Sequence, residues 1–288
     1  FQHCLATHTV LPHCACIAIA GPVTGTTEHQ QAEVTNLPWV LDSRAIADAL
    51  GIARVVLIND FAAVAYGIAA LDEVDLARLQ AGEPRPLAPR AILGAGTCLG
   101  QALLVHCGSH YEVLPTEGGH VDFAPQTALQ HELLHALQRA YGHVSYERLL
   151  SGAGLVFIYE FLQARDGGPS TLLAQADAAA LDPAAAISRS ALAGDDPIAV
   201  QALHEFVSIY GAQAGNLALA CLPFGGLYVA GGIAPKILPK LLDGRFIAAF
   251  NGKGRMATVT ARVPVHVVTH PNPGLLGAAL YAARCALR

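Results

Sequence analysis

The feature that most constrains the fold is a short apolar run that ends in two polar residues and continues as an alanine-rich segment. Residues 55–58 read Val-Val-Leu-Ile, which is typical of a strand buried on both faces. Asn59 and Asp60 follow directly, and residues 61–71 then have the composition of a helix. This order is the alternation of α/β proteins, in which ligands bind at the carboxyl ends of strands.

Similar alternation runs along the rest of the chain, so the predicted fold class is α/β. Apolar runs bounded by turn residues predict strands at 16–20, 91–93, 103–105, 111–114, 227–230 and 263–268. Capping residues and helical spacing predict helices at 42–51, 127–141 and 200–220, and at the C-terminus after a turn at 270–274. Residues 166–196 are rich in alanine and predict loops with one or two exposed helices.

Charge and composition exclude several classes of function. The 17 Lys and Arg against 22 Asp and Glu give a net charge of −5, without a basic stripe, so we expect neither nucleic acid nor an anionic membrane as a partner. No apolar run approaches the roughly 20 residues of a membrane span. The seven cysteines are odd in number and irregularly spaced, which predicts reduced thiols and a cytoplasmic location.

A glycine-rich segment from Gly94 to Gly100 is a candidate phosphate site. Gly94, Gly96 and Gly100 let a backbone approach a phosphate, whose oxygens amide N–H groups and the Thr97 hydroxyl can bind. Strands on both sides favour a β-hairpin loop, and the lysine of a P-loop is absent. A glycine-rich tight turn without a ligand stays open as the alternative.

Two further polar groups are candidates for binding and proton transfer. Asp60, held at a strand end beside Asn59, can accept a proton from a substrate hydroxyl, or it can simply cap the following helix. Glu117 and His120 flank two glycines and suit hydrogen bonds to vicinal hydroxyls, although a turn with a solvated Glu and a packed His stays open. Glu147 alone looks like a solvated helix charge.

One motif indicates different chemistry. His131-Glu132-Leu133-Leu134-His135 matches H-E-x-x-H, which on a helix can present two imidazoles to zinc with the glutamate as base. Glu160 could serve as a third ligand. A zinc metallohydrolase is therefore an alternative function, although 13 histidines make a chance match plausible.

Seven segments together resemble the bacterial glucokinases outside the ROK group. They are residues 17–25, 57–61, 94–100, 114–123, 145–152, 229–233 and 272–277. Their order along the chain makes the set far more specific than any one segment. The resemblance implies an actin-like ATPase (ribonuclease H-like) fold, with two α/β domains flanking a cleft that holds the active site. It implies a small domain of residues 1–70 plus 262–288, incomplete at its N-terminus, and a large domain of residues 71–261.

The resemblance also implies an activity, the transfer of the γ-phosphoryl group of ATP to the 6-hydroxyl of glucose with Mg²⁺, in a homodimer. Asp60 matches the catalytic base of the family. The residues that match its glucose ligands are Asn59, Asp60, Glu117, His120 and Glu147. Those that match its nucleotide-binding loops are Gly94, Gly96, Thr97, Gly100, Gly231 and Gly232. A sugar-binding regulator without catalysis is a further alternative.

This sequence departs from the family pattern in two places. Cys98 occupies a position where the family usually has glycine, so its side chain could crowd the phosphates unless its backbone conformation tolerates cysteine. The family also begins with a D-x-G-G-T-N segment that contacts phosphate and Mg²⁺, and nothing here matches it. We expect that segment to lie upstream of Phe1, and we expect the isolated chain to be poorly active with glucose binding retained.

Overall fold

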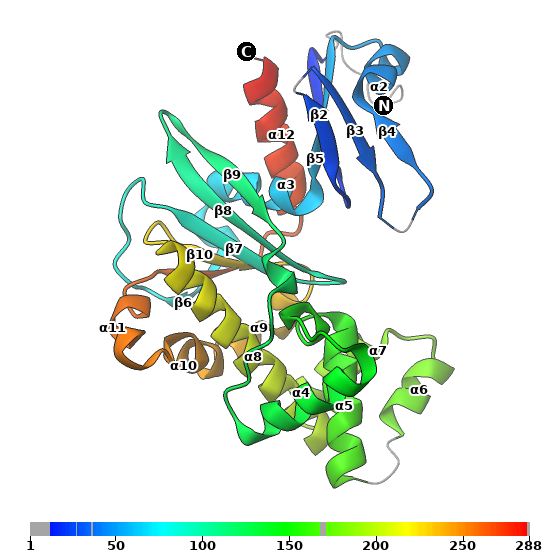
Figure 1. Ribbon diagram of the computed structural model, residues 1–288, viewed down its shortest axis with the longest axis vertical. Helices are drawn as coiled ribbons and strands as arrows, with labels where there is room; N and C mark the ends of the chain where they lie inside the picture. The colour runs from blue at the N-terminus through cyan, green and yellow to red at the C-terminus, as the bar shows by residue number, and fades with distance from the viewer. Residues whose placement is uncertain (1–11, 27, 36, 168–170, 287–288) are drawn as a thin grey trace. The chain divides into compact units, whose positions relative to one another are not determined.

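The structure is a computed structural model that describes residues 12–26, 28–35, 37–167 and 171–286. Cys4 and the start of the chain at Phe1 lie outside the described residues. The chain divides into two compact units (Figure 1). The first comprises Phe1–Asp75, Cys107–Pro115 and His270–Arg288, and the second comprises Leu76–His106 and Thr116–Thr269. The division into residues 1–70 plus 262–288 and 71–261 stays a prediction.

The first unit contains two small sheets. Strand β1 (Cys14–Ile19) pairs in parallel with β5 (Arg54–Asn59). Strands β2 (Val23–Thr26), β3 (His29–Glu33) and β4 (Val40–Asp42) form an antiparallel sheet of three strands. The buried side chains of this unit include Ile19, Ala32, Ala47, Val55 and Leu57. Burial of β5 confirms the predicted strand at residues 55–58.

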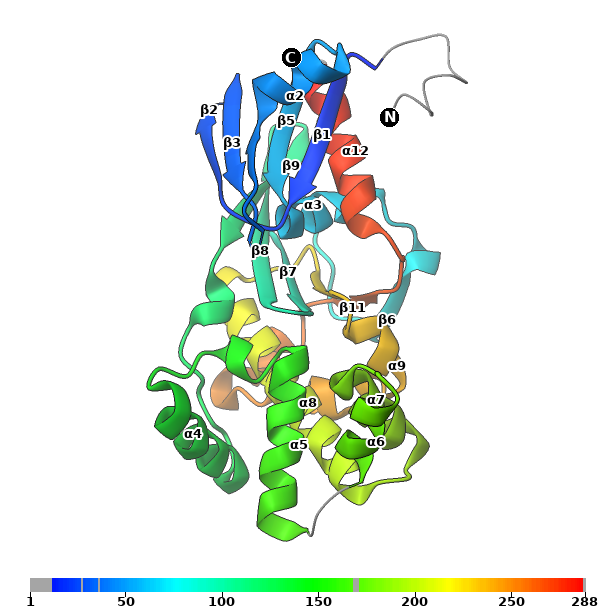
Figure 2. The same cartoon turned by 90° about the vertical axis from the view of Figure 1, so that its right-hand side faces the viewer.

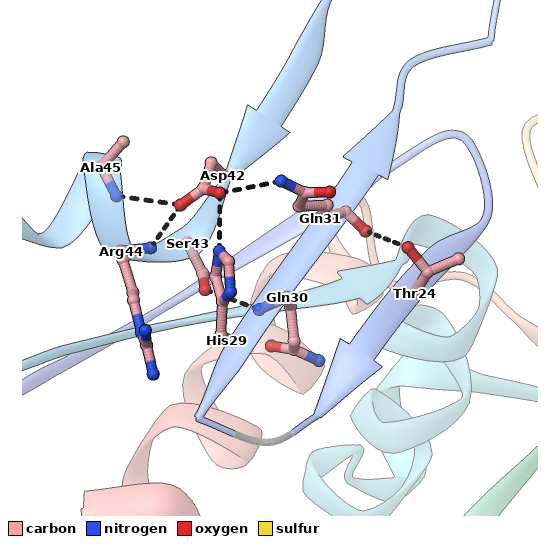
Figure 3. Close-up of polar contacts among 8 residues, drawn as sticks. All are labelled: Thr24, His29, Gln30, Gln31, Asp42, Ser43, Arg44 and Ala45. Carbon is pink, nitrogen blue, oxygen red and sulfur yellow. Dashed lines mark hydrogen bonds and ion pairs between the residues drawn. The ribbon is translucent and has the colours of Figure 1, made fainter.

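Asp42 joins the antiparallel sheet to helix α2 (Ser43–Leu50), as Figure 3 shows. Its Oδ1 accepts hydrogen bonds from the N–H groups of Arg44 and Ala45, at 3.0 and 3.1 Å. Its Oδ2 lies 2.7 Å from His29 Nε2 and accepts the amide of Gln31 at 3.0 Å. The helix ends at Gly51 in the left-handed conformation. The helix predicted at residues 42–51, with its cap, is therefore confirmed.

Helix α3 (Asp60–Gly67) follows β5 and lies against the C-terminal helix α12 (Pro273–Ala286), and Figure 2 shows α12 in red beside α3 and β1. The two helices approach so closely that a Cβ atom on Gly277 would overlap the carbonyl of Ala63. A Cβ atom on Gly67 would likewise overlap the carbonyl of Pro273. The glycines at this crossing therefore allow α3 and α12 to pack with their backbones in contact.

The segment 107–115 is held to the helices of the first unit by a polar cluster. Glu112 Oε1 lies 2.6 Å from Arg284 Nη2 and 2.7 Å from His110 Nε2, while Tyr66 donates its hydroxyl to Glu112 Oε2 at 3.1 Å. The Arg284 guanidinium also lies 5.4 Å from the centre of the Tyr66 ring. Burial raises the pKa of Tyr66, so its hydroxyl stays a hydrogen-bond donor at neutral pH.

A mixed sheet organises the second unit, with its strands in the order β6-β11-β10-β7-β8. They are β6 (Leu76–Gln80), β7 (Arg90–Ala95), β8 (Leu99–Cys107), β10 (Leu227–Ala230) and β11 (Val265–Val268). Strand β9 (His110–Thr116) falls almost entirely within the segment 107–115 of the first unit. Strand β10 is parallel to both β7 and β11, and β7 and β8 form an antiparallel hairpin. The carboxyl ends of β7 and β10 therefore meet at one edge of the sheet.

Helices make up the rest of the second unit, with α8 at its centre (Figure 1). They are α4 (Ala128–Tyr141), α5 (Gly152–Asp166), α6 (Leu172–Ala178), α7 (Pro183–Ala193), α8 (Pro197–Cys221), α9 (Leu238–Leu241), α10 (Arg245–Asn251) and α11 (Ala257–Thr260). Helix α8 contacts α5, α7 and α10, and its Phe206 and Tyr210 are fully buried. The helices predicted between 166 and 196 are α6 and α7, although α7 also buries one face, which includes Ile187.

Two observations concern the described part of the chain as a whole. None of its helices is long and apolar enough to cross a membrane. The six described cysteines are free thiols: Cys14, Cys16, Cys98, Cys107, Cys221 and Cys285. Burial raises the pKa of Cys16 and of Cys221 to about 12, so these two thiols are not reactive nucleophiles at neutral pH.

Candidate functional site

Asn59 and Asp60 lie at the junction between β5 and α3 in the first unit. Asn59 is the N-cap, and its Oδ1 accepts hydrogen bonds from the N–H groups of Phe61 and Ala62, at 2.9 and 3.1 Å. Asp60 is the first residue of the helix and is exposed. The Asp60 Oδ1 also accepts the Phe61 N–H, at 2.8 Å. The capping alternative therefore applies mainly to Asn59, and the Asp60 carboxylate lies at the surface.

The segment 94–100 is the tip of the β7–β8 hairpin, as predicted. Gly94 pairs with Gly100 and Ala95 with Leu99, and the Gly96 N–H closes the turn by donating to the Cys98 carbonyl at 2.9 Å. Thr97 and Cys98 are exposed at this tip. Cys98 is not among the described residues with positive φ, so its backbone accommodates a side chain without strain.

Buried contacts hold the base of this hairpin tip, which we call the glycine loop (residues 94–100). The hydroxyl of Tyr210, on α8, accepts the Ala95 N–H at 3.0 Å and lies 3.4 Å from the Ala230 carbonyl, to which it donates. Burial raises the pKa of Tyr210, which keeps the hydroxyl protonated. The Tyr210 side chain, which comes from α8, therefore links the end of β7 to the end of β10.

Gly231 follows β10 and lies against the glycine loop. Its φ is +84°, and a Cβ atom there would lie 2.5 Å from the carbonyl oxygen of Ala95. Two residues later, the Ile233 N–H donates a hydrogen bond to the same Ala95 oxygen at 3.2 Å. Gly232, in contrast, has open space around it. The predicted nucleotide-binding segments, 94–100 and 231–232, are therefore adjacent in the second unit.

Glu117 and His120 lie on a single turn, η3 (Gly118–His120), which we call the polar turn (residues 117–120). His120 Nε2 lies 3.9 Å from Glu117 Oε2 and 3.8 Å from Glu147 Oε2. The three side chains differ in exposure, at 92% for Glu117, 58% for His120 and 23% for Glu147. An imidazole between two carboxylates provides donors and acceptors for a ligand with several hydroxyls.

Backbone pairing brings Glu147 to the polar turn from 27 residues further along the chain. The Phe123 N–H donates to the Val144 carbonyl at 2.9 Å, and the Tyr146 N–H donates to the Val121 carbonyl at 3.1 Å. Glu147 then lies on η4 (Tyr146–Arg148), directly after this bridge. Its position next to His120 makes it part of the candidate site, whereas its local sequence indicates only a surface charge.

Glu147 also contacts the glycine loop. Its Oε2 accepts the Leu99 N–H at 3.1 Å, and the Gly152 N–H donates to the Gly96 carbonyl at 3.0 Å. The second unit therefore brings together all of its predicted site residues: Gly94, Gly96, Thr97, Gly100, Glu117, His120, Glu147, Gly231 and Gly232. Asn59 and Asp60 belong to the first unit.

Sequence reasoning missed a half-buried polar chain that ends at the buried Tyr146, the residue before Glu147. The Lys253 ammonium donates to Asn216 Oδ1 at 2.6 Å, and the Asn216 amide donates to the Tyr146 hydroxyl at 3.0 Å. Burial lowers the pKa of Lys253 and raises that of Tyr146. The only available signal was a polar residue within the apolar pattern of α8, where a buried Asn or Tyr needs a partner.

The H-E-x-x-H motif on α4 has other partners. His131 Nδ1 lies 2.8 Å from the Thr127 carbonyl, and Glu132 forms an ion pair with Arg165 at 3.3 Å. Among the described residues, no group of three His, Cys, Asp or Glu side chains is placed to hold a metal ion. Neither the geometry nor any similarity reported below supports a zinc hydrolase.

Comparisons with known proteins agree with one another. The family model described as Glucokinase matches residues 2–285. The chain is 49% identical to the glucokinase of Nostoc sp. (strain PCC 7120) over 290 residues, which cover 95% of this chain and 82% of that protein. It is 47% identical to the glucokinase of Synechocystis sp. (strain PCC 6803), covering 94% and 79%.

A solved structure gives the same result. The crystal structure of a glucokinase from an Antarctic psychrotroph is similar with a TM-score of 0.84 and 35% identity, covering 98% of this chain and 84% of that chain. This similarity confirms the predicted actin-like ATPase fold. The family model, the sequence relatives and the fold together show that the chain belongs to the glucokinase family.

Proposed function

We propose that this protein transfers the γ-phosphoryl group of ATP to the 6-hydroxyl of glucose. The observation that carries the proposal is the joint arrangement in the second unit, where a hydroxyl-binding group and a glycine loop share a hydrogen bond through Glu147. A kinase needs an acceptor site and a phosphate site in direct contact, because positioning supplies most of the catalysis of phosphoryl transfer. Family membership supports the choice of glucose and ATP.

The sugar is proposed to bind through its hydroxyl groups. The carboxylates of Glu117 and Glu147 accept hydrogen bonds from hydroxyls, and the His120 ring donates one or accepts one. The Asn59 side chain uses its Oδ1 to cap α3, and its amide donates to the Gly21 carbonyl at 3.4 Å, so the second amide hydrogen is the one that can donate to a sugar oxygen. These groups orient the ring and leave the 6-hydroxyl for reaction.

Asp60 is proposed as the general base. Its carboxylate accepts the proton of the 6-hydroxyl as that oxygen attacks the γ-phosphorus in line with the departing ADP. The exposed position at the start of α3 leaves the carboxylate open to a substrate hydroxyl. The close contact of α3 with α12 keeps the helix, and with it Asp60, in one place. Proton acceptance by a positioned carboxylate contributes typically about 10²–10⁴-fold to a rate.

The glycine loop and Gly231 are proposed to bind the nucleotide. Thr97 is exposed at the tip of the loop, where its hydroxyl and the neighbouring N–H groups can donate to phosphate oxygens. Mg²⁺ is proposed to arrive with ATP, because it binds mainly to phosphates and water, and the described residues hold no ready-made metal site. When bound, the ion offsets the negative charge of the phosphates.

The product identifies the reaction. Incubation of the protein with MgATP and glucose should give a sugar phosphate whose phosphorus is attached to O6, which ³¹P and ¹³C NMR spectra establish. 6-Deoxyglucose should compete with glucose for binding and give no phosphorylated product. A phosphate attached to another oxygen, or steady release of inorganic phosphate with no sugar phosphate, would contradict the proposal.

A further inference from the structure

Glu147 occupies a position between two parts of the candidate site. The same carboxylate oxygen, Oε2, accepts the Leu99 N–H of the glycine loop at 3.1 Å and lies 3.8 Å from Nε2 of His120. The side chain is only 23% exposed, and Tyr146 beside it is fixed by the hydrogen bond from Asn216. A charged acceptor makes a hydrogen bond roughly twice as strong as a neutral one, so this bond restrains the loop.

Leu99 is contacted from its other side by the polar turn. A Cβ atom on Gly119 would overlap the Leu99 carbonyl, so the turn and the loop touch through their backbones. The start of the turn is fixed as well, because the Thr116 hydroxyl donates to the Gln101 carbonyl at 3.1 Å and accepts the Gly118 N–H at 3.1 Å. Leu99 is therefore held by Glu147 at its N–H and by Gly119 at its carbonyl.

Glu117, the other carboxylate near His120, differs from Glu147 in its exposure and its contacts. It lies at a similar distance from His120, 3.9 Å, but its side chain is 92% exposed. Within the described residues, its carboxylate has no hydrogen bond to the glycine loop, and His120 is its ion-pair partner. Two carboxylates thus face one imidazole, and one of them also holds the phosphate loop.

We propose that Glu147 is a positioning residue for the glycine loop, so that binding of the sugar and binding of the nucleotide strengthen each other through Leu99. The inference rests on the proposed function and adds a second role for one of its residues. A sugar hydroxyl bound to Glu147 holds the carboxylate in one conformation, the one that accepts the Leu99 N–H. The glycine loop is then ordered before the nucleotide binds. Nucleotide binding therefore no longer includes the loss of conformational entropy that ordering the loop requires.

Coupling of this kind is measurable and reciprocal. If saturating glucose tightens nucleotide binding by a factor, a saturating nucleotide must tighten glucose binding by the same factor. Isothermal titration of the protein with Mg²⁺ and AMPPNP, with and without glucose, gives this coupling factor without turnover. We expect a factor on the order of 10 for the parent protein, within the usual range for coupled sites.

Two variants of Glu147 separate its role in sugar binding from its role in positioning the glycine loop. Glu147→Gln keeps the size of the side chain but makes the acceptor neutral, and we expect the coupling factor to fall at least threefold. Glu147→Ala removes the acceptor and should bring the factor close to one. Glu117→Gln is the matched control, which should weaken glucose binding yet leave the coupling factor within twofold of the parent. Thermal melting identifies any variant that fails to fold, and the Gln variant is isosteric.

The outcomes distinguish this inference from the proposed function. The role of Glu147 would be overturned if Glu147→Ala and Glu147→Gln kept the coupling factor of the parent, or if Glu117→Gln lowered that factor as much as they do. The kinase assignment would remain intact in either case. A parent that binds glucose and nucleotide without any coupling would do the same. A parent that binds no glucose would remove the proposed function, and the inference with it.

Discussion

The two units hold their candidate site residues by different kinds of contact. In the first unit, Asn59 caps α3 through N–H groups only two and three residues ahead, and Asp60 begins the same helix. In the second unit, the glycine loop depends on distant partners: Glu147 lies 48 residues from Leu99, and Tyr210 lies 115 residues from Ala95.

This difference predicts how each region responds to change. A site held by local contacts forms with its helix, so single substitutions there alter chemistry more than structure. A loop held by distant buried groups depends on the whole core of its unit, so substitutions far from it in sequence should alter ligand binding. The following predictions test that contrast.

The largest effect is expected at Asp60. Replacing Asp60 by Asn removes the proton acceptor, so kcat should fall by at least about 10²-fold. Because the contacts around Asp60 are local, the melting temperature and the Kd for glucose should stay close to those of the parent. A coupled assay and calorimetry measure both quantities. Asp48→Asn, at an exposed site on α2, is the control and should leave kcat unchanged.

Gly231 should be the most sensitive glycine near the loop. Gly231→Ala places a Cβ atom at a φ of +84° and against Ala95, which costs roughly 1–3 kcal/mol for the backbone strain alone. We expect a lower melting temperature and a raised KM for ATP, with a smaller change in the KM for glucose. Gly232→Ala, where space is open, should resemble the parent. Equal effects of the two substitutions would argue against this account of the loop.

Tyr210 tests whether its buried hydrogen bond to Ala95 stabilises the glycine loop. Tyr210→Phe removes the hydroxyl and leaves the Ala95 N–H without its acceptor, which costs about 1–3 kcal/mol for a buried donor. The KM for ATP should rise more than the KM for glucose, and chemical denaturation should show the loss of stability. Tyr228→Phe is the comparison, since Tyr228 lies on β10 and its ring stacks on that of His266 on β11. A Tyr210→Phe protein with parental stability and nucleotide binding would show that the loop stands without this bond.

Asn59 tests the local contacts of the first unit. Asn59→Ala removes the cap of α3 and should reduce the free energy of unfolding by about 1 kcal/mol. Asn59→Asp retains an acceptor for the same N–H groups and should restore most of that stability. Denaturation of the three proteins gives the answer. Should the Asp variant be as unstable as the Ala variant, the cap would not be what holds the helix start.

The smallest effect concerns Asp42 and acid pH (Figure 3). Hydrogen bonds from His29, then from Gln31 and Ala45, lower the pKa of Asp42 below its ordinary value of 3.8. A depressed pKa in the folded state contributes stability above pH 3.8, and that contribution is lost as the pH falls through the folded value. The loss begins below pH 3.8, so melting temperatures between pH 6 and about pH 2 should decline less in Asp42→Asn than in the parent. Parallel curves would rule out the contribution.

Much of the fold was predictable because its signals are local. The run at 55–58, the caps Asp42 and Gly51, and the glycine loop between two strands were all identified correctly from neighbouring residues. Strand β3 was missed because four of its five residues are polar and only Ala32 is buried. Helix α5 begins with Gly-Ala-Gly, a poor helix-forming start that only the Ser151 cap and burial of its later residues offset.

The candidate site divides in the same way. Asp60, Glu117 and His120 stand out in the sequence because each adjoins a strand end or a glycine turn. Glu147 was selected only through the family resemblance, and Tyr210 was not selected at all. Their roles depend on contacts across 48 and 115 residues, which no local pattern encodes.

Hydrogen exchange of the parent protein, followed by mass spectrometry with and without glucose, tests the central claim most directly. If the local site of the first unit and the long-range site of the second bind one sugar, glucose should slow exchange in three segments: 57–64, 117–123 and 145–150. Protection in only one unit, or an unchanged pattern at saturating glucose, would contradict it.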